Sequence, residues 1–214
     1  KKIKLNLLFS KKSWQTILGS GLKTQTIKQS MIYIIIGHKN YRSKVMNRFI
    51  IEDTPSKIAS SLCDQHIVKM PLEETQMLCT VLWHHAPSFA AEKDLYKPVH
   101  QKHPCTLWAM ENKSNYTFAF CLLGCMLKEY TARYNKYHGT TKHFASLWDG
   151  RMYLPDGKMT AHPQCFSGHD DLKTDEFMPI EAYRKFYIVD KSKFARYKYT
   201  EKPKWMENDE LKIA

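Results

Sequence analysis

Acidic residues are missing from the first part of the chain. Residues 1–50 contain 11 Lys and Arg but no Asp or Glu, whereas the remaining residues hold 22 basic and 21 acidic side chains. Long apolar runs are missing too, since the longest, Met31–Ile36, is far shorter than the roughly 20 residues that a membrane-spanning helix needs. We therefore expect no association with a membrane. The net charge of +12 favours a polyanionic partner such as nucleic acid.

The cysteines lack the features of a disulfide scaffold. Six of them are scattered through apolar stretches, no secretory signal precedes them, and a chain of 214 residues can bury a core without covalent cross-links. We expect reduced, mostly buried thiols and a cytoplasmic location. A hydrophobic content of 43% and an aromatic content of 13% are typical of a globular protein.

The composition divides the chain at about Met46. Residues 1–45 are basic and carry no clear amphipathic pattern, so they form a separate N-terminal segment. Two interpretations of this segment stay open: an organellar transit peptide, or translated sequence upstream of a domain that starts at Met46. Residues 46–214 are predicted to form one domain that ends in a basic and aromatic strap.

Capping residues and prolines predict the helices of this domain. After a short β-like run at residues 48–51, Asp53-Thr54-Pro55 predicts the start of a helix that reaches about His66. Pro71 is expected to begin a second helix that ends near residue 85, and Pro104 a third. Ser114 is expected to cap the longest helix, residues 115–137, and a last one spans residues 179–189. Residues 138–178 are predicted to be loops. The fold class is therefore mainly α: a single compact helical domain with long loops.

The densest polar cluster is Asp64-Gln65-His66, followed by Lys69 and Glu73. A carboxylate, an imidazole and an amine close together can transfer protons or hold a sugar-phosphate. The alternative is structural: Asp64 and His66 cap a helix junction, and Glu73 lies in a first helical turn, where the helix dipole favours a negative charge.

A zinc site is a second possibility in the same region. Cys63 and His66 have Cys-x-x-His spacing, and His103 and Cys105 flank Pro104. Two such pairs can complete a tetrahedral zinc site. However, His-Pro-Cys is also an ordinary helix start. We therefore expect no cofactor, with zinc on these four residues as the alternative.

Cations and aromatic rings alternate near the C-terminus, in Phe194-Ala195-Arg196-Tyr197-Lys198-Tyr199 and Lys202-Pro203-Lys204-Trp205. This pattern suits phosphate contacts combined with base stacking. It also suits a strap whose rings pack on the core while its lysines face water. The two interpretations are compatible.

Three stretches carry a resemblance to known proteins. Cys63–Met70 with Glu73, His103–Ala109, and Ala182-Tyr183-Arg184 followed by Lys193–Tyr197 resemble the motifs of a group of poorly characterised bacteriophage proteins. If this protein is viral, its location is the host cytoplasm. The resemblance extends, more loosely, to the pyrimidine-dimer DNA glycosylases of phages. Asp64-Gln65-His66 is similar to a motif of that family, and Glu73 lies nine residues after Asp64, as the family's catalytic glutamate does. Pro203-Lys204-Trp205 is similar to its C-terminal segment, although Met206 replaces a tyrosine.

That resemblance implies attack by an amine on the sugar C1′, a Schiff base assisted by glutamate, and strand cleavage by β-elimination. The family's nucleophile is the α-amine of an N-terminal threonine, whose pKa of about 7.7–8.0 leaves much of it unprotonated near neutral pH. Here Met46-Asn47 opens the domain behind 45 further residues. If the chain starts upstream of Met46, no free α-amine is available at the matching position; if it starts at Met46, the amine is that of methionine and not of threonine. Lys69 is the alternative amine.

We therefore expect a DNA-repair glycosylase and AP lyase that acts on damaged pyrimidines, with Glu73, His66 and Lys69 as catalytic residues. The expected DNA contacts are Asp64, Gln65, Arg184, Lys193, Arg196, Lys198, Lys204 and Trp205. A non-catalytic viral DNA- or RNA-binding protein and a zinc-dependent nucleic-acid enzyme are the alternatives. The sequence specifies neither the lesion nor the oligomeric state.

Overall fold

The structure, a computed structural model, describes residues 47–166, 168–175 and 179–207. The chain divides into two units, Lys1–Lys44 and Val45–Ala214, and all described residues belong to the second. The expected basic segment, residues 1–45, lies outside them. The described part is a helical domain without β-strands, which confirms the mainly α fold class. None of its helices combines the length and apolarity needed to cross a membrane.

The first two helices differ from the prediction in where the first one ends and the second one begins. α3 spans Pro55–Ser61, with the Thr54 side chain accepting from the Lys57 amide and proline in the first turn, as expected. Leu62 and Cys63 are extended, and α4 then runs unbroken over Asp64–His85 with Pro71 inside it. The expected break at Pro71 was therefore wrong. Pro71 leaves the Ile67 carbonyl without its usual helical donor, but buried side chains on both sides of it keep the helix continuous.

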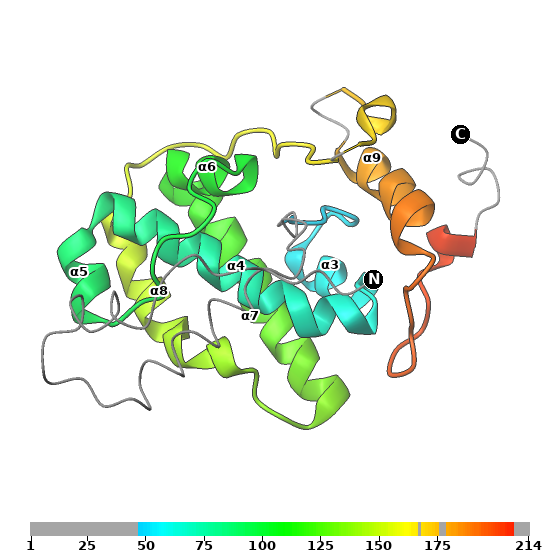
Figure 1. The fold of residues 1–214 in the computed structure, drawn as a ribbon, viewed down its shortest axis with the longest axis horizontal. Coiled ribbons are helices and arrows are strands. Elements are labelled where there is room, and N and C mark those ends of the chain that lie inside the picture. The colour runs from blue at the N-terminus through cyan, green and yellow to red at the C-terminus, as the bar shows by residue number, and fades with distance from the viewer. Residues whose placement is uncertain (1–46, 167, 176–178, 208–214) are drawn as a thin grey trace, which may run out of the picture. The chain divides into compact units, whose positions relative to one another are not determined.

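α7 packs against α3, α4 and α6, and with α4 forms the centre of the domain (Figure 1). α5 spans Pro87–Glu92, and α6 spans Pro104–Glu111 with the His103 side chain accepting from the Cys105 amide. α7 spans Lys113–Tyr134. Its N-cap is Asn112 and not Ser114, because the Asn112 side chain accepts from the Asn115 amide.

The described residues between 138 and 175 contain helical turns where only loops were expected. They contain a 3₁₀ turn at Gly139–His143, α8 at Phe144–Gly150, a turn at Arg151–Tyr153 and another at Asp170–Leu172. The prediction of loops throughout was wrong because α8 is too short to show a periodic pattern. It is fixed by tertiary contacts: Leu147 is fully buried, and a Cβ added to Gly150 would lie 2.4 Å from the Leu82 side chain.

The last segments of the described part are a helix, a π-helical turn and a strap. α9 spans Pro179–Phe186 and continues into a π-helical turn at Tyr187–Lys191, close to the predicted helix 179–189. The strap, which we define as residues 192–205, follows and leads into a 3₁₀ turn at Lys204–Glu207. Residues 48–51, expected to be β-like, pair with no strand in the described part. They are nevertheless buried in the core between α3, α4 and α9.

Candidate functional site

The strap is bound to the first turn of α4. The Asp64 amide donates to the Arg196 carbonyl at 2.8 Å, so the strap satisfies one of the amides that a helix N-terminus leaves unpaired. The Gln65 side chain bonds the strap backbone twice, donating to the Phe194 carbonyl at 2.8 Å and accepting from the Arg196 amide at 3.1 Å. Gln65, expected to contact DNA, thus uses its amide group within the protein.

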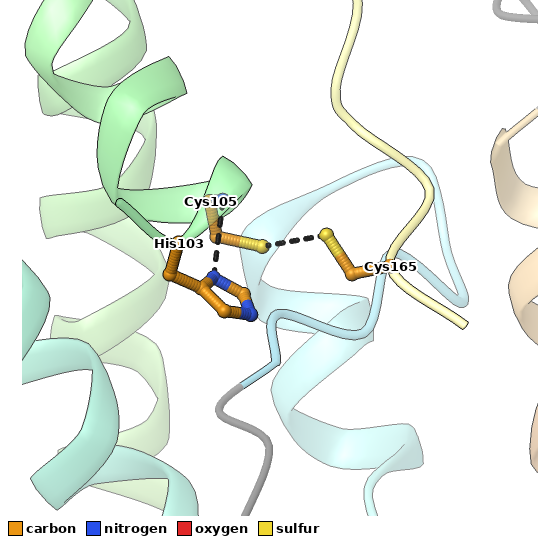
Figure 2. Close-up of side chains that lie close together, drawn as sticks. All are labelled: His103, Cys105 and Cys165. Atoms are coloured by element: carbon orange, nitrogen blue, oxygen red, sulfur yellow. Dashed lines mark hydrogen bonds between the residues drawn. The ribbon is translucent and has the colours of Figure 1, made fainter. Parts of the chain in front are cut away.

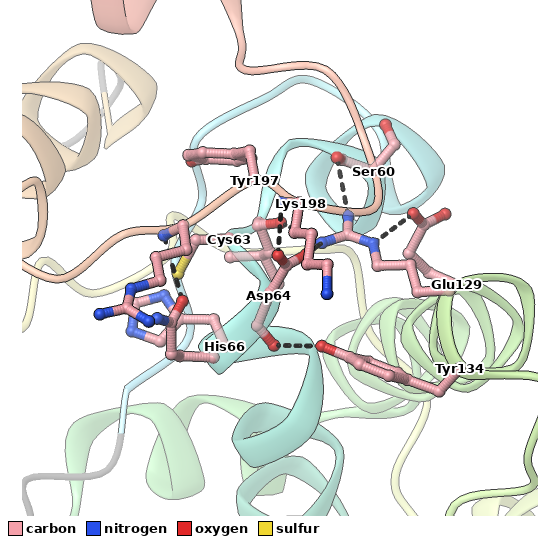
Figure 3. A network of polar contacts seen from close by, with 12 residues as sticks. Ser60, Cys63, Asp64, His66, Glu129, Tyr134, Tyr197 and Lys198 are labelled. Atoms are coloured by element: carbon pink, nitrogen blue, oxygen red, sulfur yellow. Dashed lines mark hydrogen bonds and ion pairs between the residues drawn. The ribbon is translucent and has the colours of Figure 1, made fainter.

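Asp64 is the centre of a polar network (Figure 3). Its carboxylate accepts from the Lys198 amide at 2.7 Å and from the buried guanidinium of Arg133 at 3.1 Å. Arg133 also pairs with Glu129 at 2.7 Å and donates to the Leu62 and Ser60 carbonyls. Asp64, expected to contact DNA, therefore uses both carboxylate oxygens to hold the strap and α7 against the start of α4.

His66 lies inside a group of aromatic rings. It stacks on Phe49 with centroids 4.6 Å apart and meets the edges of Tyr187 and Phe194 at 5.2 and 5.6 Å. Its Nδ1 is 2.7 Å from the Tyr187 hydroxyl. Burial, with the nearby charges of Lys191 and Lys69, lowers the pKa of His66 to about 3. The imidazole is therefore neutral near pH 7 and links segment 47–51 to the strap.

Lys69 and Glu73 form an ion pair one turn further along α4. Lys69 Nζ lies 2.7 Å from Glu73 Oε1, and 33% of the Lys69 side chain is exposed, against 8% for Glu73. Solvent therefore reaches this ion pair at the Lys69 side chain. Because the charges of Lys69 and Lys191 both act on His66, the two ammonium groups lie near the same ring. The structure therefore brings the three predicted catalytic residues, Glu73, His66 and Lys69, to one region of α4.

Arg184 and Trp205 meet at Glu52. Arg184 Nη2 lies 2.7 Å from Glu52 Oε2 and its Nε donates to the Ile51 carbonyl. The Trp205 indole N–H donates to Glu52 Oε1 at 2.8 Å, and the Arg184 guanidinium lies 5.4 Å from the Trp205 ring centre. These two predicted DNA contacts thus anchor the far end of the strap.

The remaining predicted DNA contacts are distributed along the strap, and all four are exposed: Lys193, Arg196, Lys198 and Lys204. Phe194 and Tyr199, on the same segment, are 43% and 49% exposed. Beneath the strap lies a pocket of about 650 Å³, bordered by the π-helical turn, Tyr197 and Lys202. A line of cations with open aromatic rings is what phosphate contact combined with base stacking requires.

Sequence reasoning missed Phe49, Tyr187 and Lys191 as members of this region. Lys191 pairs with Asp190 at 2.6 Å, and its ammonium lies 4.8 Å from the Phe186 ring centre. The Tyr187 hydroxyl contacts His66 across 121 residues of sequence. The sequence offered one signal, the alternation of cations and aromatic rings from Lys191 to Trp205, which does not specify a partner.

The four residues considered for zinc do not come together. In the described residues His103 and Cys105 lie with Cys165, while His66 packs on Phe49 and Tyr187. The set Cys63, His66, His103 and Cys105 was therefore wrong as a ligand group, because Cys63 and His66 lie beside the Tyr187 ring that follows α9.

The polar cluster at the start of α4 lies within a segment that matches the model of a known family. Residues 46–142 match the family model of the pyrimidine dimer DNA glycosylases. The match includes Lys69 and Glu73 but stops before α9 and the strap. It agrees with the resemblance seen in the sequence. No curated protein and no solved structure gives a significant match to the chain.

Proposed function

We propose that this protein is a DNA-repair glycosylase and AP lyase that acts on pyrimidine dimers. Its similarity to the glycosylase family over residues 46–142 supports DNA as the substrate. The observation that carries the proposal is the 2.7 Å contact between Lys69 Nζ and Glu73 Oε1. An amine in contact with a carboxylate provides the nucleophile and the proton acceptor that Schiff-base chemistry on a sugar requires.

The reaction begins when Lys69 gives one proton to Glu73. The free amine attacks C1′ of the damaged nucleotide, and the bond from C1′ to the base breaks with its electron pair leaving on the base, which takes the proton from Glu73. A second proton moves from the nitrogen to the ring oxygen O4′, the C1′–O4′ bond breaks so that the sugar ring opens, and a protonated Schiff base forms at C1′. Glu73 then removes a C2′ proton, the C3′–O bond breaks, and water releases the sugar from Lys69. The partial exposure of Lys69 allows the sugar to reach the amine.

In this proposal the strap binds the DNA backbone. Its cations Lys193, Arg196, Lys198 and Lys204 neutralise phosphates, and Phe194 and Tyr199 stack on displaced bases. Asp64, Gln65 and His66 act indirectly, because their hydrogen bonds and ring contacts hold the strap at the start of the helix that carries Lys69. Arg184 and Trp205 hold its other end through Glu52.

Borohydride trapping tests the chemistry, because it reduces a Schiff base to a stable protein–DNA adduct. We expect the wild-type protein to give an adduct on ultraviolet-irradiated duplex and none on undamaged duplex. Lys69→Ala should give no adduct, and Glu73→Gln should react about 10²–10⁴-fold more slowly, the usual contribution of a general base.

Lys57→Ala is the matched control, since Lys57 forms an exposed ion pair of the same i,i+4 spacing with Asp53, which precedes α3. It should trap at the wild-type rate. Equal adduct yield from Lys69→Ala, or no adduct from the wild-type protein, would refute the proposed chemistry.

A second candidate is a nucleic-acid-binding protein without catalysis, which the exposed cations of the strap favour. It predicts equal affinity for damaged and undamaged duplex. Removing a single phosphate-binding side chain, for example in Lys193→Ala, should reduce the slope of log affinity against log salt by about 0.9. Binding without trapping would favour this candidate over the enzyme.

A further inference from the structure

A histidine and two cysteines meet where α6 begins (Figure 2). His103 is the N-cap of α6, and Cys105 is the second residue of that helix. Cys165 comes from the connection between α8 and α9, 60 residues further along the chain. One ligand atom from each of the three lies within 4.8 Å of the other two. Neither the proposed reaction nor the strap uses this cluster.

The distance between the sulfur atoms suits a shared metal ion. Cys105 Sγ and Cys165 Sγ are 3.6 Å apart. A disulfide requires about 2.05 Å, so these sulfur atoms are not bonded. In a tetrahedral zinc site with Zn–S bonds of about 2.3 Å, two sulfur ligands lie about 3.8 Å apart. The sulfur atoms are therefore close to the spacing that zinc requires.

We propose that His103, Cys105 and Cys165 bind one Zn²⁺ ion, with water as the fourth ligand. Two thiolates and an imidazole favour zinc over magnesium and calcium, which prefer oxygen ligands. Cys105 is fully buried, whereas His103 and Cys165 are partly exposed, so both the ion and a water molecule can reach the cluster.

The surroundings of the cluster are compatible with a zinc ion bound to two thiolates. Each cysteine loses its thiol proton on binding, so one ion releases two protons and the Zn²⁺(Cys⁻)₂ group is neutral. The nearby Arg48, whose Nη1 lies 3.4 Å from the Cys105 carbonyl, is itself neutralised by Glu74. His103 Nδ1 accepts from the Cys105 amide at 3.2 Å, so zinc bound at Nδ1 would replace this single cap hydrogen bond, whereas zinc bound at Nε2 would leave it in place.

Zinc at this position would join two segments of the chain, the start of α6 and the connection that carries Cys165. The Cys165 carbonyl accepts from the Asn47 side chain at 2.8 Å, and the Cys165 amide donates to the Tyr183 hydroxyl of α9 at 3.3 Å. The ion would add a direct link from this point to α6. Zinc bound here would therefore fix the connection that leads to α9 and the strap, and its water ligand would leave one coordination position open.

The test uses the full-length protein after reduction and removal of metal. Titration with Zn²⁺ against a chromogenic chelator should give one equivalent bound. Co²⁺ should give the strong visible absorption of a tetrahedral site and a thiolate-to-cobalt charge-transfer band. Zn²⁺ should also raise the melting temperature of the wild-type protein.

Two variants locate the ligands. His103→Asn keeps a good N-cap side chain but removes the imidazole, and Cys165→Ser changes a partly exposed residue. Both should keep the wild-type circular dichroism spectrum and lose stoichiometric Zn²⁺ binding and the cobalt spectrum. Cys121→Ala is the control, because Cys121 is an exposed cysteine on α7; it should bind like the wild type.

Three results would overturn the proposal. The first is less than one equivalent bound by the reduced wild-type protein. The second is unchanged binding in His103→Asn or Cys165→Ser, or loss of binding in Cys121→Ala. The third is a Cys105–Cys165 disulfide that persists in mass spectra of protein kept with Zn²⁺ under mild reducing conditions.

Discussion

Glu73 and Glu74 are neighbours on α4, yet their ion pairs lie in different surroundings. Glu73 pairs with Lys69, whose side chain is one-third exposed. Glu74 pairs with Arg48, and both side chains are sealed, with 1% and 0% exposed. The Arg48 guanidinium bonds Glu74 with two nitrogens and also approaches His162. Because successive helical residues point about 100° apart, adjacent positions can face the interior and the edge of the domain.

This comparison indicates that solvent exposure, and not residue type, separates a reactive ion pair from a structural one. A buried ion pair holds its charges against a large desolvation cost, so removal of one partner leaves an uncompensated charge. An ion pair at the edge costs little to break and can exchange a proton with a bound molecule. We therefore expect substitutions at the two glutamates to affect different properties.

Glu74→Ala should have the largest effect on stability. It leaves the buried Arg48 guanidinium without its carboxylate, which typically costs about 3–5 kcal/mol. Urea denaturation measures the free energy of unfolding. The double variant Arg48→Met/Glu74→Leu removes both charges and should recover most of the loss. A cost below about 1 kcal/mol in Glu74→Ala would show that the pair is not sealed.

Asp64→Ala should have the next largest effect, about 2–3 kcal/mol, because it removes one carboxylate partner of buried Arg133 and the acceptor of the Lys198 amide. Hydrogen exchange at the Lys198 amide should become faster as the strap loosens. Asp53→Ala, in an exposed pair with Lys57, is the control and should stay within about 0.5 kcal/mol of wild type. Unchanged exchange at Lys198 would mean that Asp64 does not hold the strap.

Local signals in the sequence predicted the helical class and several helix starts. Thr54-Pro55 and Pro104 begin helices where expected, because capping and the fixed φ of proline act within a few residues. The sequence also showed that His66, Lys69 and Glu73 are close together along the chain, although it placed them at a junction between two helices and not on one helix. The continuous helix through Pro71 and the short helix α8 were not predicted, since packing with distant segments decides both.

The partners of the site residues could not be predicted in the same way. Arg48 meets Glu74, Asp64 meets Lys198, and Cys165 meets Cys105 across 26 to 134 residues of sequence. Neither charge nor spacing specifies such pairs. The zinc alternative shows this most clearly, because the sequence suggested His103 and Cys105 but combined them with Cys63 and His66 in place of Cys165.

His66 makes a contribution to stability that depends on pH. Its pKa is about 3 in the folded protein, below the usual value of about 6.5, so the unfolded chain binds a proton that the folded one does not. Stability should therefore fall as pH drops from 6.5 towards 3, by up to about 1.4 kcal/mol per pH unit from this residue. His66→Gln should flatten the dependence by that amount in urea denaturation between pH 6.5 and 4.5. His162, whose pKa is also lowered by burial, acts equally in both proteins. Parallel curves would contradict the neutral, buried imidazole.

Lys69→Met should have the smallest effect on stability, at most about 1 kcal/mol, because its ion pair is partly exposed. Measuring Lys69→Met and Glu74→Ala in the same denaturation series compares the free energy of unfolding that each ion pair contributes. A loss similar to that of Glu74→Ala would place both pairs in the same structural class.

Identifying the residue that becomes attached to the sugar is the most direct test of the proposed chemistry. After borohydride trapping on ultraviolet-irradiated duplex, nuclease and protease digestion followed by mass spectrometry locates the reduced adduct. We predict that the remnant is attached to Lys69 Nζ, beside Glu73. An adduct on the N-terminal amine or on a lysine of the strap would contradict the assignment of Lys69 as the nucleophile.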